Sequence, residues 1–116
     1  MKMRQGFVSN SSSTSFLITN INEYDMEVDL VKFVEENIRY IDDYNYNYNG
    51  NFTYLEVLEV AKARNITWQP GETKEVEFGD NEGPWGKTPL GHVFDITIRD
   101  GGKSENFEWK FLKFNR

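Results

Sequence analysis

His92 and Asp95 are the one pair close in sequence that could carry general acid–base chemistry. Apolar and polar residues alternate around them, which predicts a β-strand over residues 92–99. Because positions 92 and 95 point to opposite faces of a strand, their side chains are not expected to meet. His92 is the only histidine and the chain has no cysteine, which excludes multi-histidine metal sites and thiolate nucleophiles. We therefore favour a non-enzymatic protein without a metal or cofactor.

Negative charge is concentrated in one segment. The net charge is −6, and residues 23–43 hold eight acids against two bases, whereas the rest of the chain is neutral with eleven of each. From Asp29 onward, apolar residues recur every three to four positions, which predicts a helix to about Tyr40 with its acids mostly outward. Such a face favours a protein partner with a basic surface and disfavours nucleic acid. The acids expected to bind this partner are Glu35, Glu36, Asp42 and Asp43.

Tyrosine and asparagine alternate strictly from Tyr44 to Asn49, and Gly50 follows. Since Asn-Gly favours positive φ, the pattern predicts a loop or hairpin tip between Tyr40 and Tyr54. Tyrosine with asparagine is also the mixture found in antibody paratopes, so Tyr44, Tyr46 and Tyr48 are expected to form a recognition surface beside the acidic helix. The same alternation is compatible with three rings packed against a sheet.

A run of hydroxyl residues lies between aromatic residues near the start of the chain: Gly6, Phe7, Val8, Ser9, Asn10, Ser11, Ser12, Ser13, Thr14, Ser15 and Phe16. It resembles the Gly-Phe-Val-Ser-Asn-Ser-Ser-Ser-Ser-Ser-Phe opening of small proteins from phages and from bacteria with prophage-like DNA. Thr14 is the one departure. The resemblance implies a phage-type origin and brings no activity with it. Two interpretations stay open: residues 1–15 are a leader read by another protein, or their hydroxyls satisfy backbone groups beside the sheet.

The remaining patterns predict one α+β domain over residues 16–116. Strands are expected over residues 16–19, around Val76 and Phe78, over 92–99 and over 107–112, and Asp100-Gly101-Gly102 is expected to join the last two as a hairpin. Residues 66–69 are compatible with an additional strand. Thr53 and Glu56 have capping-box spacing, which predicts a second helix to about Arg64. We expect an antiparallel sheet of about four strands with two helices on one face.

A connection rich in glycine and proline spans residues 79–91. The alternative to a binding protein is a small ligand-binding or enzymatic domain whose pocket lies under this connection, near Trp85, His92 and Asp95. The sequence has neither a membrane-spanning stretch of ~20 apolar residues nor a secretory signal, so we expect no membrane partner and a location in the cytoplasm, the host's if a phage encodes the chain. An edge strand would permit dimerisation by sheet pairing, but the oligomeric state stays open.

Overall fold

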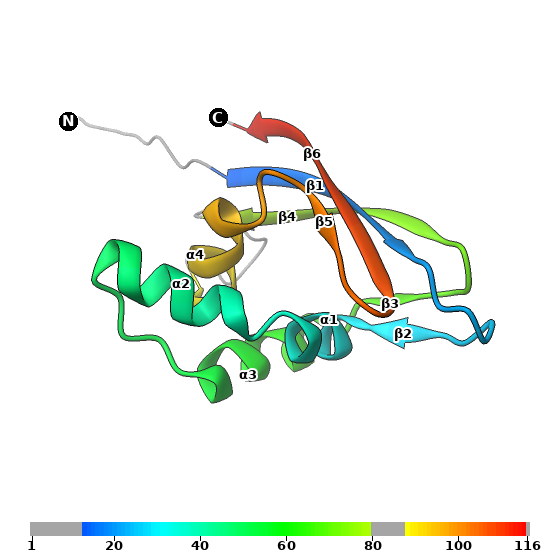
Figure 1. Ribbon diagram of the computed structural model, residues 1–116, viewed down its shortest axis with the longest axis horizontal. Coiled ribbons are helices and arrows are strands. Elements are labelled where there is room, and N and C mark those ends of the chain that lie inside the picture. The colour runs from blue at the N-terminus through cyan, green and yellow to red at the C-terminus, as the bar shows by residue number, and fades with distance from the viewer. Residues whose placement is uncertain (1–12, 80–87, 116) are drawn as a thin grey trace.

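The strands form two antiparallel sheets in the computed structural model, which describes residues 13–79 and 88–115. The larger sheet has the order β4-β1-β6-β5 and is made of β4 (Thr73–Gly79), β1 (Ser13–Asn20), β6 (Phe107–Asn115) and β5 (Gly102–Lys103). The smaller sheet pairs β2 (Val28–Asp29) with β3 (Thr67–Trp68). Because β1 pairs with β4 on one side and β6 on the other, the first and last strands lie side by side (Figure 1).

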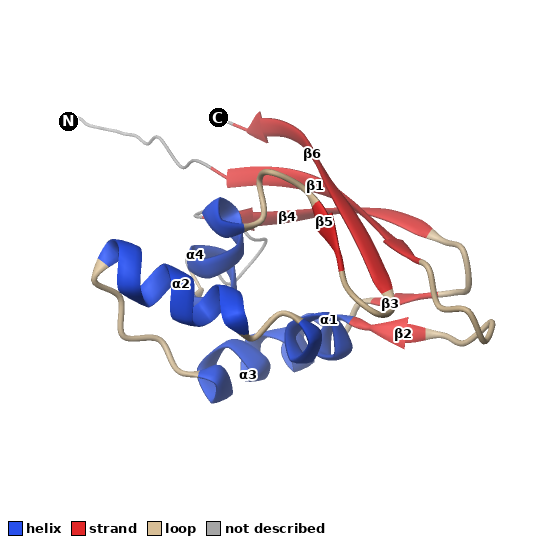
Figure 2. Ribbon diagram, viewed as in Figure 1, coloured by secondary structure: helices blue, strands red, loops and turns tan. Residues whose placement is uncertain are grey.

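The described residues contain four helices: α1 (Leu30–Glu36), α2 (Arg39–Tyr48), α3 (Tyr54–Arg64) and α4 (Pro89–Thr97). They lie on the same side of the larger sheet (Figure 2). Three of them begin with a side-chain oxygen that accepts a hydrogen bond from a backbone N–H: Asp29 from Lys32, Thr53 from Glu56, and Thr88 from Gly91. The predicted α+β class, an antiparallel sheet of four strands with helices on one face, is confirmed, with four helices rather than two.

Several predicted elements are confirmed where local signals agree. The second predicted helix is α3, and both halves of its capping box, Thr53 and Glu56, are present. The strands predicted at the start of the chain, around Val76 and from Phe107 correspond to β1, β4 and β6. The first predicted helix begins as expected after Asp29, but α1 ends at Glu36, where the N–H of Asn37 donates to the carbonyl of Val34.

The loop predicted between Tyr40 and Tyr54 is wrong for its first part, because residues 39–48 form α2. The alternation of tyrosine with asparagine hides a helical spacing in which Ile41, Tyr44 and Tyr48 share one side. Ile41 is buried and Tyr44 is half-buried. Asn49 ends the helix in the left-handed region at φ 54°, which confirms the positive φ expected of Asn-Gly.

The strand predicted over residues 92–99 is also wrong, because residues 92–97 belong to α4 and the turn that follows the helix contains residues 98 and 99. Thr88 caps the helix and Pro89 occupies its first turn, where a missing N–H costs nothing. Leu90, Val93 and Phe94 are buried at helical spacing. Apolar residues in this segment recur both at the two-residue period of a strand and at the 3.6-residue period of a helix. The alternation alone therefore did not distinguish a strand from a buried helix.

The hairpin predicted at Asp100-Gly101-Gly102 is displaced along the chain. Gly102 lies in β5, which pairs with β6, so the turn falls over residues 104–106 and is closed by a hydrogen bond from Ser104 N to Phe107 O. Gly101 does have the positive φ expected of it, 79°, but it lies between α4 and β5. The displacement follows from α4, because the strand that the hairpin was expected to begin from is a helix.

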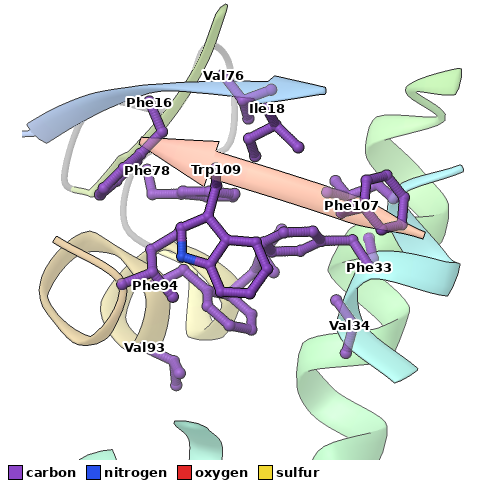
Figure 3. Packing of buried hydrophobic residues seen from close by; sticks show 14 of the residues in the cluster. Phe16, Ile18, Phe33, Val34, Val76, Phe78, Val93, Phe94, Phe107 and Trp109 are labelled. Atoms are coloured by element: carbon purple, nitrogen blue, oxygen red, sulfur yellow. The ribbon is translucent and has the colours of Figure 1, made fainter. Parts of the chain in front are cut away.

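Seven of the eighteen buried hydrophobic residues in the described core are aromatic, and several of these rings pack against one another between the sheet and the helices (Figure 3). Trp109 of β6 is 1% exposed and lies edge-on to Phe33 of α1, with 5.4 Å between ring centroids. Phe33 also contacts Phe94 of α4 at 5.5 Å and Phe107 of β6 at 5.3 Å. Burial of each such side chain contributes roughly 2–3 kcal/mol. These rings fix α1 and α4 to the sheet, and the position of α1 determines where α2 begins.

Candidate functional site

The outward side of α2 carries Asp42, Asp43 and Tyr46, and we call these three residues the α2 face. Tyr46 follows Asp42 by four positions and Asp43 by three, so the three side chains share one side of the helix. All three are exposed, and the ring of Tyr46 is 87% exposed. The other side of α2 holds the buried Ile41 and packs toward α4. The α2 face is therefore held on a helix that the core anchors from behind.

No described side chain neutralises the carboxylates of the α2 face. Arg39 precedes Asp42 and Asp43 by three and four residues, which is the spacing of a helical ion pair. Its guanidinium instead donates to the hydroxyl of Tyr40 at 3.1 Å and lies 4.9 Å from that ring's centroid. Within residues 13–79 and 88–115, a single ion pair is present, between the guanidinium of Arg99 and the carboxylate of Asp95, with 3.2 Å between nitrogen and oxygen.

The three tyrosines predicted to act together point in different directions. Tyr44 packs inward, with its ring centroid 5.1 Å from Tyr48 and 5.8 Å from Phe52. Tyr48 follows Tyr44 by one turn and stays partly exposed, whereas Tyr46 lies on the opposite side of the helix. A strand would have placed all three rings on one face. The helix leaves Tyr46 as the ring that is directed to solvent.

Glu35 and Glu36, adjacent in sequence at the end of α1, have different environments. Glu35 is exposed. The carboxylate of Glu36 is half-buried and accepts hydrogen bonds from the hydroxyl of Ser104, the N–H of Asn106 at 2.9 Å and the amide of Asn106. Glu36 therefore joins α1 to the turn between β5 and β6. Its carboxylate was predicted to bind a partner, but these hydrogen bonds already engage it.

The rest of the acidic segment does not lie on the same surface as α2. Residues 21–27 form the loop that leads to β2, at the far end of the molecule from α2 (Figure 1). Glu27 accepts a hydrogen bond from the side chain of Gln69 at 2.7 Å, and Asp29 caps α1. The expected single acidic element is therefore divided, and the carboxylates that share a helix with the tyrosines are those of the α2 face.

Asn45 has a positioning role that the sequence did not reveal. Its side-chain amide donates to the carbonyl of Phe52 at 2.8 Å, and its side-chain oxygen accepts from the N–H of Phe52 at 3.1 Å. These bonds tie the loop over residues 49–53 to the inner side of α2. A helical register for the tyrosine–asparagine repeat would have placed Asn45 beside Tyr44 on this inner side.

The end of the serine run is part of the sheet. β1 begins at Ser13, and Ser13, Thr14 and Ser15 are buried. The hydroxyls of Ser13 and Thr14 donate to the carboxylates of Glu77 and Asp95, and the hydroxyl of Ser15 accepts from the amide of Asn115 at 2.8 Å. Phe16 is fully buried in the core. The other predicted leader residues, Gly6, Phe7, Ser9, Asn10, Ser11 and Ser12, lie outside the described residues.

The residues of the alternative pocket have separate surroundings. The ring of His92 is 5.2 Å from Phe52 and 6.5 Å from Tyr44, both measured between centroids. The carboxylate of Asp95 accepts from Thr14 and Arg99 instead. Trp85 lies outside the described residues. These contacts give His92 a place in a ring cluster and give Asp95 a place at the junction of α4 with β1.

A hollow of about 420 Å³ with a mixed polar and apolar lining lies at the far end, beside the loop over residues 21–27. Its lining includes the exposed Tyr24 and Met26, together with Asn22 and Asn106, whose side chains hydrogen-bond each other. Asn20 supports the loop by donating to the carbonyls of Met26 and Trp68 at 2.8 Å and 3.2 Å. The turn-prone run Asn20-Ile21-Asn22 could have indicated this loop from sequence, but Asn106, the partner of Asn22, lies near the other end of the chain.

Residues 13–79 and 88–115 contain no group of three or more histidine, cysteine, aspartate or glutamate side chains placed to hold a metal ion. No helix in this part of the chain has the length and apolar character needed to cross a membrane.

Comparison with known proteins does not place the chain in a family. No protein-family model matches it, and neither a curated protein nor a solved structure shows a significant match.

Proposed function

We propose that this chain is a small non-enzymatic accessory protein of phage type that binds a host or phage protein through the α2 face. The observation that carries the proposal is the exposure of Asp42, Asp43 and Tyr46 on one side of a helix, with no ion pair from the described residues to either carboxylate. The phage-type origin depends on the resemblance of the serine run alone.

The composition of the α2 face suits a protein partner with a basic surface. Tyr46 offers a large ring with few rotatable bonds, which is typical of residues that anchor protein interfaces. The two carboxylates would steer a basic partner toward the ring and oppose an acidic one. Their field would also repel nucleic-acid phosphates.

The backbone beneath the α2 face supports the same proposal. A loop would lose conformational entropy when it binds, but α2 is already ordered by the buried Ile41 and by the two hydrogen bonds between Asn45 and Phe52. Tyr44 and Tyr48 add an aromatic layer on the inner side. The side chains of the α2 face are therefore presented in a geometry that binding need not create.

The test compares proteins captured from a bacterial lysate by the immobilised chain and by the variant Asp42→Asn/Asp43→Asn/Tyr46→Ala. The loop at the far end provides a matched control, Glu23→Gln/Asp25→Asn/Tyr24→Ala, which also removes two carboxylates and one exposed tyrosine. Capture is measured at about 50 mM and about 500 mM salt, because contacts between exposed charges are screened by ions.

We expect a stoichiometric basic protein that is retained at low salt, released at high salt, lost by the α2 variant and kept by the control. Equal capture by the α2 variant contradicts the proposal, as does a loss confined to the control variant. The proposal also fails if the wild-type chain captures no protein that the α2 variant fails to capture. Circular dichroism of both variants shows that they are folded.

A further inference from the structure

The second half of β6 has a free edge. β1 pairs with β6 on one side along its length, but on the other side β5 pairs only with Trp109 and Glu108. No strand among the described residues pairs with residues 110–115 on that side, and we call this segment the β6 edge. In Figure 1 it continues beyond the short β5. Six strand residues extend about 20 Å.

The backbone groups of Phe111 and Phe114 face this open side. Asn20 at the end of β1 hydrogen-bonds with Gly71 and Glu72, on the side of β4. In an antiparallel strand, the N–H and C=O groups of successive residues point alternately to the two neighbouring strands. Since those of Asn20 point to β4, the backbone groups of every second residue from Thr19 back to Ser13 point to β6. Their register partners are Glu108, Lys110, Lys113 and Asn115. Three residues of the segment remain: Leu112 is the extra residue of a bulge, and the N–H and C=O groups of Phe111 and Phe114 are directed away from β1.

The two edges of the larger sheet differ in protection. On β4, the guanidinium of Arg64 donates to the carbonyl of Glu77 at 3.1 Å and lies 5.5 Å from the ring centroid of Phe78. Sheets commonly cover or charge their edges in this way, which prevents pairing with other chains. At the β6 edge, the guanidinium of Arg99 lies 4.8 Å from the ring centroid of Phe114, but no described side chain bonds to the backbone of residues 110–115 as Arg64 does to Glu77. Three apolar side chains stay exposed there: Phe111 at 38%, Leu112 at 38% and Phe114 at 51%.

We propose that a second copy of this chain pairs with the β6 edge, antiparallel and about a two-fold axis between Leu112 and Lys113. This register uses the whole edge and places Phe111 of each copy opposite Phe114 of the other. Lys110 then lies opposite Asn115, and Leu112 opposite Lys113, so no lysine faces a lysine. Aromatic cross-strand pairs stabilise a sheet, whereas like charges directly opposite destabilise it.

A bulge in β6 favours a second copy over an unrelated strand. Phe111 pairs with Phe16 and Lys113 with Ser15, which leaves Leu112 as an extra residue. A regular strand would therefore fall out of register by one residue when it passed Leu112. A second copy carries the same extra residue at the centre of the pairing, so both Phe111–Phe114 pairs remain in step.

The interface joins two larger sheets into one and removes the free edge from both copies. A two-fold contact is closed, because each copy pairs through the same edge segment of β6. The contact is short, and small interfaces are usually weak, so we expect a dissociation constant on the order of 10 µM.

The first experiment is sedimentation velocity of the full chain from about 1 to about 300 µM, a range that spans this expected dissociation constant. We expect a monomer–dimer equilibrium that Phe114→Lys weakens at least about tenfold. The matched control Tyr46→Lys places a lysine on an exposed ring of the α2 face and should leave the equilibrium unchanged, which also separates this proposal from the proposed function. If Phe114→Lys fails to fold by circular dichroism, Leu112→Lys replaces it.

The second experiment uses the absence of native cysteine. Oxidation of a mixture of Leu112→Cys and Lys113→Cys chains should give a disulfide-linked heterodimer, because the two positions are opposite each other in the proposed register. Neither variant, when oxidised alone, should give a disulfide-linked homodimer to the same extent. A monomer at every concentration, a dimer that Phe114→Lys does not weaken, assemblies that grow beyond two copies, or equal cross-linking of the single variants would each overturn the proposal.

Discussion

α1 and α2 come from one acidic stretch of sequence, but the protein uses them differently. α1 buries Leu30, Phe33 and Val34, and its Glu36 is bound to the turn between β5 and β6. α2 buries Ile41 and leaves Asp42 and Asp43 in solvent without an ion pair to the described residues. The role of a carboxylate here depends on which backbone donors the fold brings to it, and not on the local density of charge.

The largest effect should follow from Phe33→Ala, which removes the ring that joins α1 to Phe94, Phe107 and Trp109. We expect a loss of about 3–5 kcal/mol in the free energy of unfolding, because the cavity is fully enclosed. Urea denaturation measures it. The control Tyr46→Ala, on the α2 face, should change stability by less than about 0.5 kcal/mol. Similar losses for both rings would remove the distinction between the two helices.

Glu36→Ala should have the next largest effect. It leaves the N–H of Asn106 and the hydroxyl of Ser104 without their carboxylate partner, and we expect a loss of about 1–3 kcal/mol. The adjacent Glu35→Ala, at an exposed position, should be nearly neutral in the same denaturation experiment. If the two variants are equally stable, Glu36 is not the link between α1 and the turn, and it returns to the set of carboxylates available to a partner.

Helix starts offer a third comparison. Thr53 caps α3 and forms a capping box with Glu56, whereas Ile38 at the start of α2 provides no side-chain cap. Thr53→Ala should therefore lower the free energy of unfolding by about 1 kcal/mol. Ile38→Ala, at a position that is partly exposed, should cost less. Thermal denaturation of the two variants compares them, and an equal loss would show that the α3 cap contributes little.

The smallest effects should distinguish the two carboxylates of the α2 face. Asp42 lies in the first turn of α2, where the helix dipole favours a negative charge, so Asp42→Asn should cost about 0.3–1 kcal/mol. Asp43→Asn should change stability by less than about 0.5 kcal/mol. Differential scanning calorimetry at low salt measures both. A larger loss for Asp43→Asn would indicate a structural role for that carboxylate.

Prediction from sequence succeeded where the signals were local and consistent. Both ends of α3 follow from the capping box and from the apolar period that comes after it. β6 follows from the alternation of Phe107 and Trp109 with charged residues. Prediction failed at α2 and α4, because a strict alternation of residue types imitated the period of a loop tip or a strand. Thr88 with Pro89 was the start signal that could have identified α4.

The candidate site was predictable only in part. Asp42, Asp43 and Tyr46 were among the expected contact residues, and the structure leaves them exposed. Glu36 and Tyr44 were expected to join them, but their side chains are engaged by the β5–β6 turn and by the ring cluster around Phe52. No pattern within a short window reports the contacts of Glu36, since Ser104 and Asn106 lie 68 and 70 residues away along the chain. The contacts of Tyr44 depend on α2 being a helix, which the alternation of residue types concealed.

The sequence by itself determined the α+β class, the capping box of α3 and the position of the excess negative charge. These follow from local propensity, hydrophobic periodicity and composition, which need no knowledge of distant residues. Only the tertiary structure decided which carboxylates remain free, which tyrosine faces solvent and which strand edge stays open. Those outcomes depend on the approach of β6 and its preceding turn to β1 and α1, and burial and backbone pairing across that distance are set when the chain folds.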